Sequence, residues 1–383
     1  MKKNILIILL LPLFFLNSCK KKEIEKNMVT TENDAIKVAN SILSINKSNK
    51  EIEKIKTVKD NNNIVAYYVI KYKNKGFALI SGDKRFSPIL GYSDESNFSF
   101  EKMPEQLKPI MDNFVKNVEF VRKNKMIAND TINERWDYVL QGIPSWLETG
   151  GGTPDEPTPV DPIEPGDEPH TPILYDITYN LCLVSTRWDQ GCGYNDNTPI
   201  LSDGPCGHAY TGCVTTAMAQ IMKYHNYPTN YNWNDMPNNN PSSSIANLMG
   251  DIFSHVIHSY DVNGSSGYLY DGRKNACDAF NYFNYNSVVY HENAMSDSNS
   301  ITYSLSAGNP ILFAGALSDN SNIGHAWVCD GMVTHVYDCC TDVSYHMNWG
   351  WSGNGNGFFS SWIFNSPIGN LHHRLEMITN IHP

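Results

Sequence analysis

The chain has 383 residues, enough for two or three domains, and 18% of them are charged. Its formal net charge of −11 at pH 7 disfavours nucleic acid as a partner, because a phosphate-binding surface needs an excess of basic side chains. The second half is rich in Asn, Tyr, Ser and Gly, which indicates an exported protein, and the nine cysteines permit disulfides without fixing their pairing.

The N-terminus has the pattern of a bacterial export signal. Lys2 and Lys3 precede an apolar run, residues 5–16, that is short for a membrane span. The run leads into a Leu-Asn-Ser-Cys sequence ending at Cys19, which resembles a lipobox. We therefore expect residues 1–19 to be a lipoprotein signal peptide, with Cys19 lipidated and the protein anchored to a membrane of the cell envelope. An ordinary signal peptide or an anchor helix is the alternative.

Residues 28–140 are predicted to form a small α+β domain. We expect a capped amphipathic helix after Thr31, strands near 64–70 and 76–82, and a second helix over about 104–123. The region contains no cysteine, no histidine and no cluster of catalytic side chains. A packing or regulatory role therefore fits it best.

Residues 148–172 have the composition of a linker between domains. Three consecutive glycines lead into seven prolines interleaved with Asp and Glu. Such a sequence favours extended polyproline II conformation and cannot assemble a hydrophobic core. We expect a domain boundary here that is exposed to proteases, followed by a second domain over residues 175–383.

The clearest element of this second domain is an expected helix from Cys213 to His225. Its apolar residues recur with the period of a helix that has one buried face, and Asn226 can end it in the left-handed conformation. Cys213 would then lie in the first turn beside Gly212, where N–H groups and the helix dipole stabilise a thiolate. A cysteine on an apolar helix is also found as a small core residue, so the helix alone does not establish catalysis.

Two later stretches supply further catalytic groups. His325 follows Gly324 at the start of an apolar strand, and Asn348 and Trp349 lie where another strand enters a glycine-rich turn. A cysteine peptidase needs a thiol, a histidine to hold it as thiolate and protonate the leaving amine, and a group that fixes the imidazole tautomer. Cys213, His325 and Asn348 supply these groups in that order, and an adjacent Trp would shield the His–Asn bond from water.

These stretches resemble the streptopain family of papain-like cysteine peptidases. The resemblance covers the chain from about Leu181 to the end, and the region before the linker resembles the family's inhibitory propeptide. The matching segments are residues 190–195, 212–228, 264–267, 324–326 and 346–351.

The resemblance implies an α+β, papain-like fold, in which a helical part and an antiparallel β part face each other across a cleft. It implies that Cys213 is the nucleophile, His325 the general acid/base and Asn348 its orienting group, and that Trp349 packs over the pair. The family's propeptide displaces the histidine and is removed by proteolysis, and its substrates carry an apolar residue at the second position before the cut.

Residues beside the substrate follow from the same resemblance. Ser266 and Gly324 are expected to lie along the substrate backbone. The family has a glutamine where this chain has Gly207, so the second oxyanion-hole donor is open, with Gln190 and His208 as candidates.

The other cysteines leave several arrangements open. Seven remain once Cys19 and Cys213 are set aside, and six of them could pair in fifteen ways. A metal cluster built on Cys206, His208 and Cys213 is disfavoured because no second pair of ligands follows. We expect no metal and no cofactor.

Together these patterns predict an exported cysteine endopeptidase, made as a zymogen, that cleaves proteins and is inhibited by its own propeptide. Membrane attachment through the lipid would last until maturation, which could release the peptidase domain. Two alternatives are a catalytically silent surface binding protein with the same fold and a papain-like cell-wall amidase.

Overall fold

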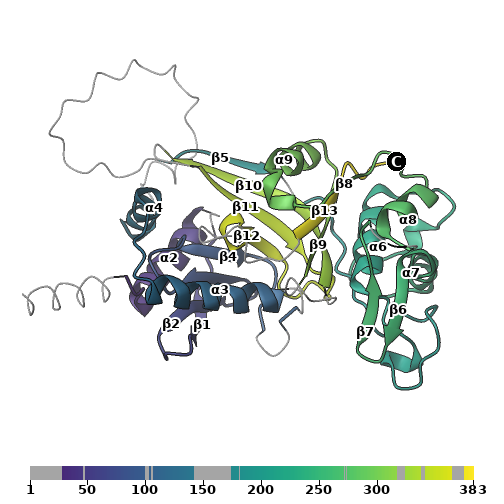
Figure 1. Ribbon diagram of the computed structural model, residues 1–383, viewed down its shortest axis with the longest axis horizontal. Coiled ribbons are helices and arrows are strands. Elements are labelled where there is room, and N and C mark those ends of the chain that lie inside the picture. Colours follow the sequence, from purple (N-terminus) through teal and green to yellow (C-terminus); the bar gives the residue numbers. More distant parts are fainter. Residues whose placement is uncertain are drawn as a thin grey trace, which may run out of the picture.

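The fold was analysed in a computed structural model (Figure 1). It describes residues 28–45, 48–99, 103–104, 107–141, 174–180, 182–270, 272, 274–316, 324–337, 341–364 and 375–383. The predicted signal peptide with Cys19 and the predicted linker, residues 148–172, lie outside the described residues. Within the described ranges, no helix has the length and apolar character needed to cross a membrane.

Residues 28–141, here called the N-terminal segment, form a four-stranded antiparallel sheet with helices on both faces. The expected helices and strands are present, together with β1, β4 and α4, which had not been predicted. The elements are α2 (Glu32–Ile45), β1 (Ile52–Lys59), β2 (Val65–Tyr72), β3 (Phe77–Ser81), β4 (Ile89–Ser93), α3 (Leu107–Lys123) and α4 (Asp130–Gln141).

The local sequence explains these elements. Thr31 caps α2, because its hydroxyl accepts from the Asp34 N–H at 3.1 Å while the Asp34 carboxylate accepts from the Thr31 N–H at 3.3 Å. Asn74 turns the chain between β2 and β3 with a φ of 61°. Successive side chains of β2 point to opposite faces of the sheet, so that Tyr68 packs on the side of α2 and α4 and Val69 packs on the side of α3.

A buried ion-pair network fastens α3 to the sheet. Arg122 donates to Asp60 and to Asp83, each at 2.8 Å, and both carboxylates are fully buried. Arg85 donates to Asp83 at 2.8 Å as well. Since buried charges are costly unless they are paired, removal of one partner from this network would destabilise the fold.

Residues 174–383, here called the C-terminal segment, consist of a helical part and a β part (Figure 1). The helical part contains α6 (Cys213–His225), α7 (Ser243–Val256), α8 (Ala276–Tyr282), the hairpin β6 (Ile257–Asp261) and β7 (Gly264–Gly267), and the 3-10 turns η1 (Pro205–Gly207) and η2 (Trp233–Asp235). The β part contains β5 (Leu174–Asn180), β8 (Val289–His291), η3 (Ala294–Ser296), α9 (Ser298–Ser306), β9 (Ile311–Ala316), β10 (Gly324–Tyr337), β11 (Thr341–Asn348), β12 (Gly357–Ser360), α10 (Ser361–Phe364) and β13 (Leu375–Thr379).

One sheet runs through both segments. Among the described residues its strand order is β1-β2-β3-β4-β12-β11-β10-β9-β13-β8, with β5 paired to β10. The segments join where β4 pairs antiparallel with β12, placing Tyr92 opposite Phe358 and Gly91 opposite Phe359. The sheet of the N-terminal segment therefore continues directly into the sheet of the C-terminal segment.

The structure narrows the cysteine arrangements. Cys192 and Cys206 form a disulfide, whereas four other described cysteines are not part of one: Cys182, Cys213, Cys277 and Cys329. Cys339 and Cys340 lie outside the described residues. Pairing of Cys206 in a disulfide leaves no place for it in a metal cluster with His208.

Candidate active site

Helix α6 places Cys213 at its N-terminus. Gly212 precedes it with φ 86° and ψ 150°, and a Cβ on Gly212 would lie 2.9 Å from the Ser265 carbonyl oxygen in β7. This backbone conformation and close approach require glycine. Gly212 has no side chain with which to cap the helix, and the positive end of the helix dipole at Cys213 favours a thiolate there.

The helix ends as the sequence predicts. Asn226 adopts the left-handed conformation with φ 50° and ψ 43°, and its N–H donates to carbonyls of the last turn. Buried residues run from Val214 to Met222, so α6 is surrounded by the core of the helical part. The cysteine is thereby held on a rigid element.

A cavity of about 450 Å³ lies between the helical and β parts and contains Cys213. It brings together five of the residues expected from the sequence: Cys213, His325, Gln190, Ser266 and Gly324. Its other described walls are Asp189, Tyr210, Ser259, Tyr260, Asp261, Asn263, Gly264, Ser265 and Trp351. The thiol and the imidazole, which are 112 positions apart in the sequence, therefore share one site.

His325 lies in β10 opposite Gly315 of β9. Burial lowers the pKa of its imidazole to about 4, so the ring is neutral at neutral pH in this structure. A neutral imidazole can accept a proton from a thiol, which is the first act required of a general base.

Asn348 and Trp349 lie away from the described walls of this cavity. The Asn348 amide donates to the Thr186 carbonyl at 2.7 Å and accepts from the Gly350 N–H at 3.2 Å. The Trp349 side chain is buried, and its indole N–H donates to the Gly355 carbonyl at 2.9 Å. The orienting role of Asn348 and the shielding role of Trp349 stay predictions.

Trp351, which had not been chosen from the sequence, lines the cavity instead. Trp351 lies in the turn after β11, whose last residue, Asn348, pairs with Val328 of β10. The turn is tied down beside the cavity, because the Ser352 hydroxyl donates to Asp189 at 2.6 Å.

The two candidates for the second oxyanion-hole donor differ in their position relative to the cavity. Gln190 lines the cavity, whereas the ring of His208 hydrogen-bonds to the Thr198 carbonyl at 2.9 Å and lies outside the described lining. The Cys192–Cys206 disulfide joins the segment after Gln190 to η1. This covalent link helps to fix the position of Gln190.

Comparison with protein families matches both segments. Residues 188–230 and 229–359 match the model of the Peptidase C10 family, and residues 26–118 match the Spi protease inhibitor model.

Two relatives are similar over most of this chain. Streptopain from Streptococcus pyogenes is 28% identical over 341 residues, which cover 76% of this chain and 73% of streptopain. Thiol protease/hemagglutinin PrtT from Porphyromonas gingivalis is 27% identical over 321 residues, which cover 74% of this chain and 32% of PrtT. This chain thus spans about a third of the length of PrtT.

A solved structure has the same fold. A fragment of Prevotella intermedia prointerpain A superposes with a TM-score of 0.59 at 18% identity, covering 87% of this chain and 99% of the fragment. The expected α+β, papain-like fold is confirmed. With residues 188–359 matching the Peptidase C10 family and residues 26–118 the Spi protease inhibitor, the chain is a streptopain-like cysteine endopeptidase made as a zymogen with an N-terminal inhibitor domain.

Proposed function

We propose that this chain is an exported endopeptidase zymogen in which Cys213 is the nucleophile and His325 the general acid/base. The observation that carries the proposal is the shared cavity, with Cys213 at an uncapped helix N-terminus and His325 in its opposite wall. The Cys213 N–H and the Gln190 side chain are the proposed oxyanion-hole donors.

The chemistry follows from these positions. His325 takes the thiol proton, and the thiolate attacks the carbonyl carbon of the scissile peptide. The imidazolium then protonates the leaving amine as the carbon–nitrogen bond breaks, which leaves an acyl group on Cys213. Water deprotonated by His325 releases that acyl group, and both residues return to their starting states.

The cavity suits an extended polypeptide. Ser266 and Gly324 lie on opposite walls, where backbone groups of a substrate strand could hydrogen-bond. Three aromatic side chains in the walls, Tyr210, Tyr260 and Trp351, offer apolar contact to a substrate side chain. We propose protein substrates with an apolar residue at the second position before the scissile bond.

The N-terminal segment would inhibit this site indirectly. Every described residue that lines the cavity belongs to the C-terminal segment. The N-terminal segment instead holds the turn that carries Trp351, because the Gly355 N–H donates to the Asn97 carbonyl at 2.9 Å and Pro104 packs against Gly355. We propose that this contact fixes the turn in an inactive arrangement.

Asn348 links this turn to catalysis. In this structure its side-chain oxygen accepts from Gly350, the first residue of the turn. Release of the turn after loss of the N-terminal segment would free that oxygen to accept from His325 and fix its tautomer. Asn348 would thus act as a positioning residue in the mature enzyme.

Export and membrane attachment complete the proposal. The lipobox-like sequence supports cleavage before Cys19 and lipidation of its thiol. Cleavage in the Pro-rich sequence 148–172 would separate the peptidase from this anchor.

Mass spectrometry of the purified chain and of its Cys213→Ala variant tests the proposal. Both are incubated with reductant at neutral pH. We expect loss of the N-terminal segment in the unmodified chain and an intact Cys213→Ala chain. Maturation of the variant without added protease would show that Cys213 is not the nucleophile.

A further inference from the structure

The cavity that contains Cys213 carries negative charge for which the chemistry above has no use. Asp189 and Asp261 both line it. No lysine or arginine is among its described walls, and His325 is neutral at neutral pH because burial lowers its pKa to about 4. A substrate side chain that enters the cavity therefore meets a negatively charged surface.

Two hydrogen bonds hold the Asp189 side chain in place. Oδ1 accepts from the Gln190 N–H and Oδ2 from the Ser352 hydroxyl, each at 2.6 Å. Both donors are uncharged, so they orient the carboxylate without neutralising it. Each carboxylate oxygen can accept more than one hydrogen bond, so Asp189 keeps the capacity to bind a cationic group.

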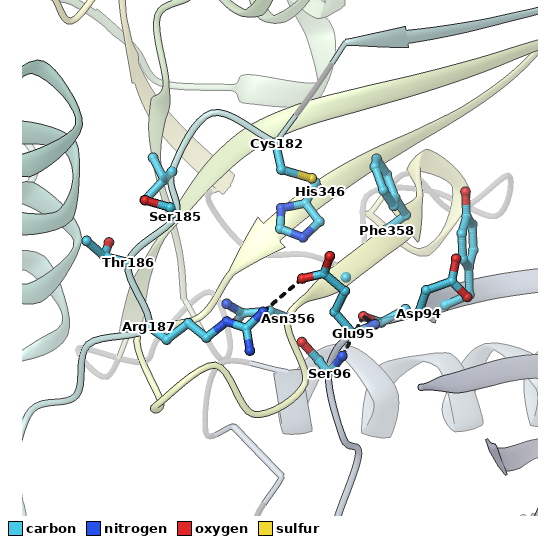
Figure 2. Close-up of a pocket in the computed structure, with 14 residues that line it drawn as sticks. Asp94, Glu95, Ser96, Cys182, Ser185, Thr186, Arg187, His346, Asn356 and Phe358 are labelled. Atoms are coloured by element: carbon cyan, nitrogen blue, oxygen red, sulfur yellow. Dashed lines mark hydrogen bonds and ion pairs between the residues drawn. The ribbon is translucent and has the colours of Figure 1, made fainter. Parts of the chain in front are cut away.

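The basic side chain nearest to Asp189 in the sequence points elsewhere. Arg187 lines a different cavity, where it pairs with Glu95 at 2.8 Å (Figure 2). The stem of Arg187 packs against Gly353, where an added Cβ would lie 2.8 Å from Cδ of Arg187. Within the described ranges, neither Asp189 nor Asp261 forms an ion pair.

The two carboxylates belong to different walls, and both walls adjoin the nucleophile. The Thr211 N–H donates to the Gln190 carbonyl at 3.0 Å, which holds the wall with Asp189 beside the residues that lead into Cys213. Gly212 lies against Ser265 of the β6–β7 hairpin, which carries Asp261. Both negative charges therefore flank the backbone that positions the reactive thiol.

Asp189 is expected to have the larger effect on a bound substrate. Its side chain is half-buried, whereas Asp261 is exposed at the end of the hairpin, where its Oδ1 accepts from the Asn263 N–H at 2.7 Å. Water and salt screen the attraction between exposed charges, so such pairs contribute little.

We propose that Asp189 is a specificity-determining residue, which makes the enzyme prefer protein substrates with a lysine or arginine within three positions of the scissile bond. The inference rests on the proposed function, because Cys213 and His325 must cleave the substrate that Asp189 selects. The ammonium or guanidinium group donates to the Asp189 carboxylate. This preference adds to that for an apolar residue at the second position before the bond.

The test uses the full-length chain after maturation and a set of internally quenched peptides. Every peptide keeps an apolar residue at the second position before the bond. One of the other five positions, up to three residues on either side of the bond, carries Lys, Gln or Glu. kcat/KM is measured at neutral pH and low ionic strength, and mass spectrometry of the products identifies the bond that is cut.

At one or more of these positions we expect Lys to be preferred over Gln, and Gln over Glu. The advantage of Lys over Gln should be about 5- to 20-fold, between the small effect of an exposed ion pair and the larger effect of a buried hydrogen bond to a charged group. It should shrink in 0.5 M salt, which screens the attraction.

Equal values for the three residues at all five positions, or a preference for Lys that salt leaves unchanged, would overturn this inference alone. No cleavage of any peptide would overturn the proposed function as well.

Asp189→Asn tests whether the preference comes from this residue. The Asn carbonyl oxygen can still accept from the Gln190 N–H, so that contact is kept while the charge is lost. We expect kcat/KM to fall about 5- to 20-fold for the Lys peptide and to rise for the Glu peptide. General damage to the site would lower both values, so the opposite signs identify the lost charge.

Asp203→Asn is the matched control. It removes an exposed carboxylate that lies outside the described lining of the cavity, so the order of the three peptides should stay as in the unmodified enzyme. An equal fall for the Lys and Glu peptides in Asp189→Asn, or the same change of order in Asp203→Asn, would overturn the assignment to Asp189.

Discussion

The junction of β4 with β12 offers a direct test of how the two segments hold together. A Cβ added to Gly91 would lie 2.7 Å from Cδ1 of Phe359, whereas ordinary contact begins at 3.4 Å. Phe359 has no room to move aside, because it is fully buried and packs against Phe77 and Trp349 with ring centroids 6.3 and 5.3 Å away. Gly91→Ala therefore overpacks the junction.

Overpacking of a core costs about 1–3 kcal/mol. At this position the substitution destabilises the pairing of β4 with β12. A loss of about 1–3 kcal/mol corresponds to roughly 5- to 150-fold more frequent separation of β12 from β4. Hydrogen exchange of the Cys213→Ala chain measures this opening, because amides exchange only when their strand separates.

The expected result is faster exchange in peptides that cover β4 and β12, with no change in those that cover α6 and α7. Gly191→Ala is the matched control, since its added Cβ would meet its nearest neighbour at 3.9 Å. Unchanged exchange in β12, or an equal increase in every peptide, would refute the reasoning.

Three further predictions concern the active-site helix, the buried network and pH. Gly212→Ala should lower the free energy of unfolding by about 1–3 kcal/mol and reduce peptidase activity, because the backbone conformation of Gly212 is nearly restricted to glycine. Urea titration measures the first effect and turnover rates the second. Unchanged values of both would contradict the assigned geometry. Arg122→Met should cost about 3–5 kcal/mol in urea denaturation, since the buried Asp60 carboxylate loses its cationic partner while Asp83 keeps only Arg85. A loss below about 1 kcal/mol would count against the network. Burial lowers the pKa of His325 and His335 to about 4, so the unfolded chain binds protons that the folded chain excludes as pH falls from 6.5 to 4. The free energy of unfolding should therefore fall over this window by up to about 1.4 kcal/mol per pH unit for each histidine. His325→Asn should make this dependence on pH less steep, and an unchanged dependence would contradict the burial of His325.

Local patterns predicted the parts of the site that depend on local structure. The helix beginning at Cys213 could be identified because its apolar period, the preceding Gly212 and the terminal Asn226 all indicate the same element. His325 could be placed at the start of a strand for similar reasons, and β10 does begin at Gly324.

Features that depend on distant pairing escaped prediction. Strand β4 is five residues long with a central glycine, so its sequence carries little periodicity, and its pairing with β12 joins positions far apart in the chain. The position of Trp351 in the cavity wall depended on the path of the turn after β11, which local sequence does not specify. The Cys192–Cys206 disulfide was likewise one of many possible pairings.

The central claim is that Cys213 and His325 form one catalytic pair, and labelling of the matured enzyme with a thiol-directed peptidyl epoxide tests it most directly. Peptide mapping by mass spectrometry is expected to locate the label on Cys213, with labelling lost in a His325→Ala enzyme matured by added protease. Labelling of Cys182 in place of Cys213, or equal labelling of Cys213 without His325, would contradict the account.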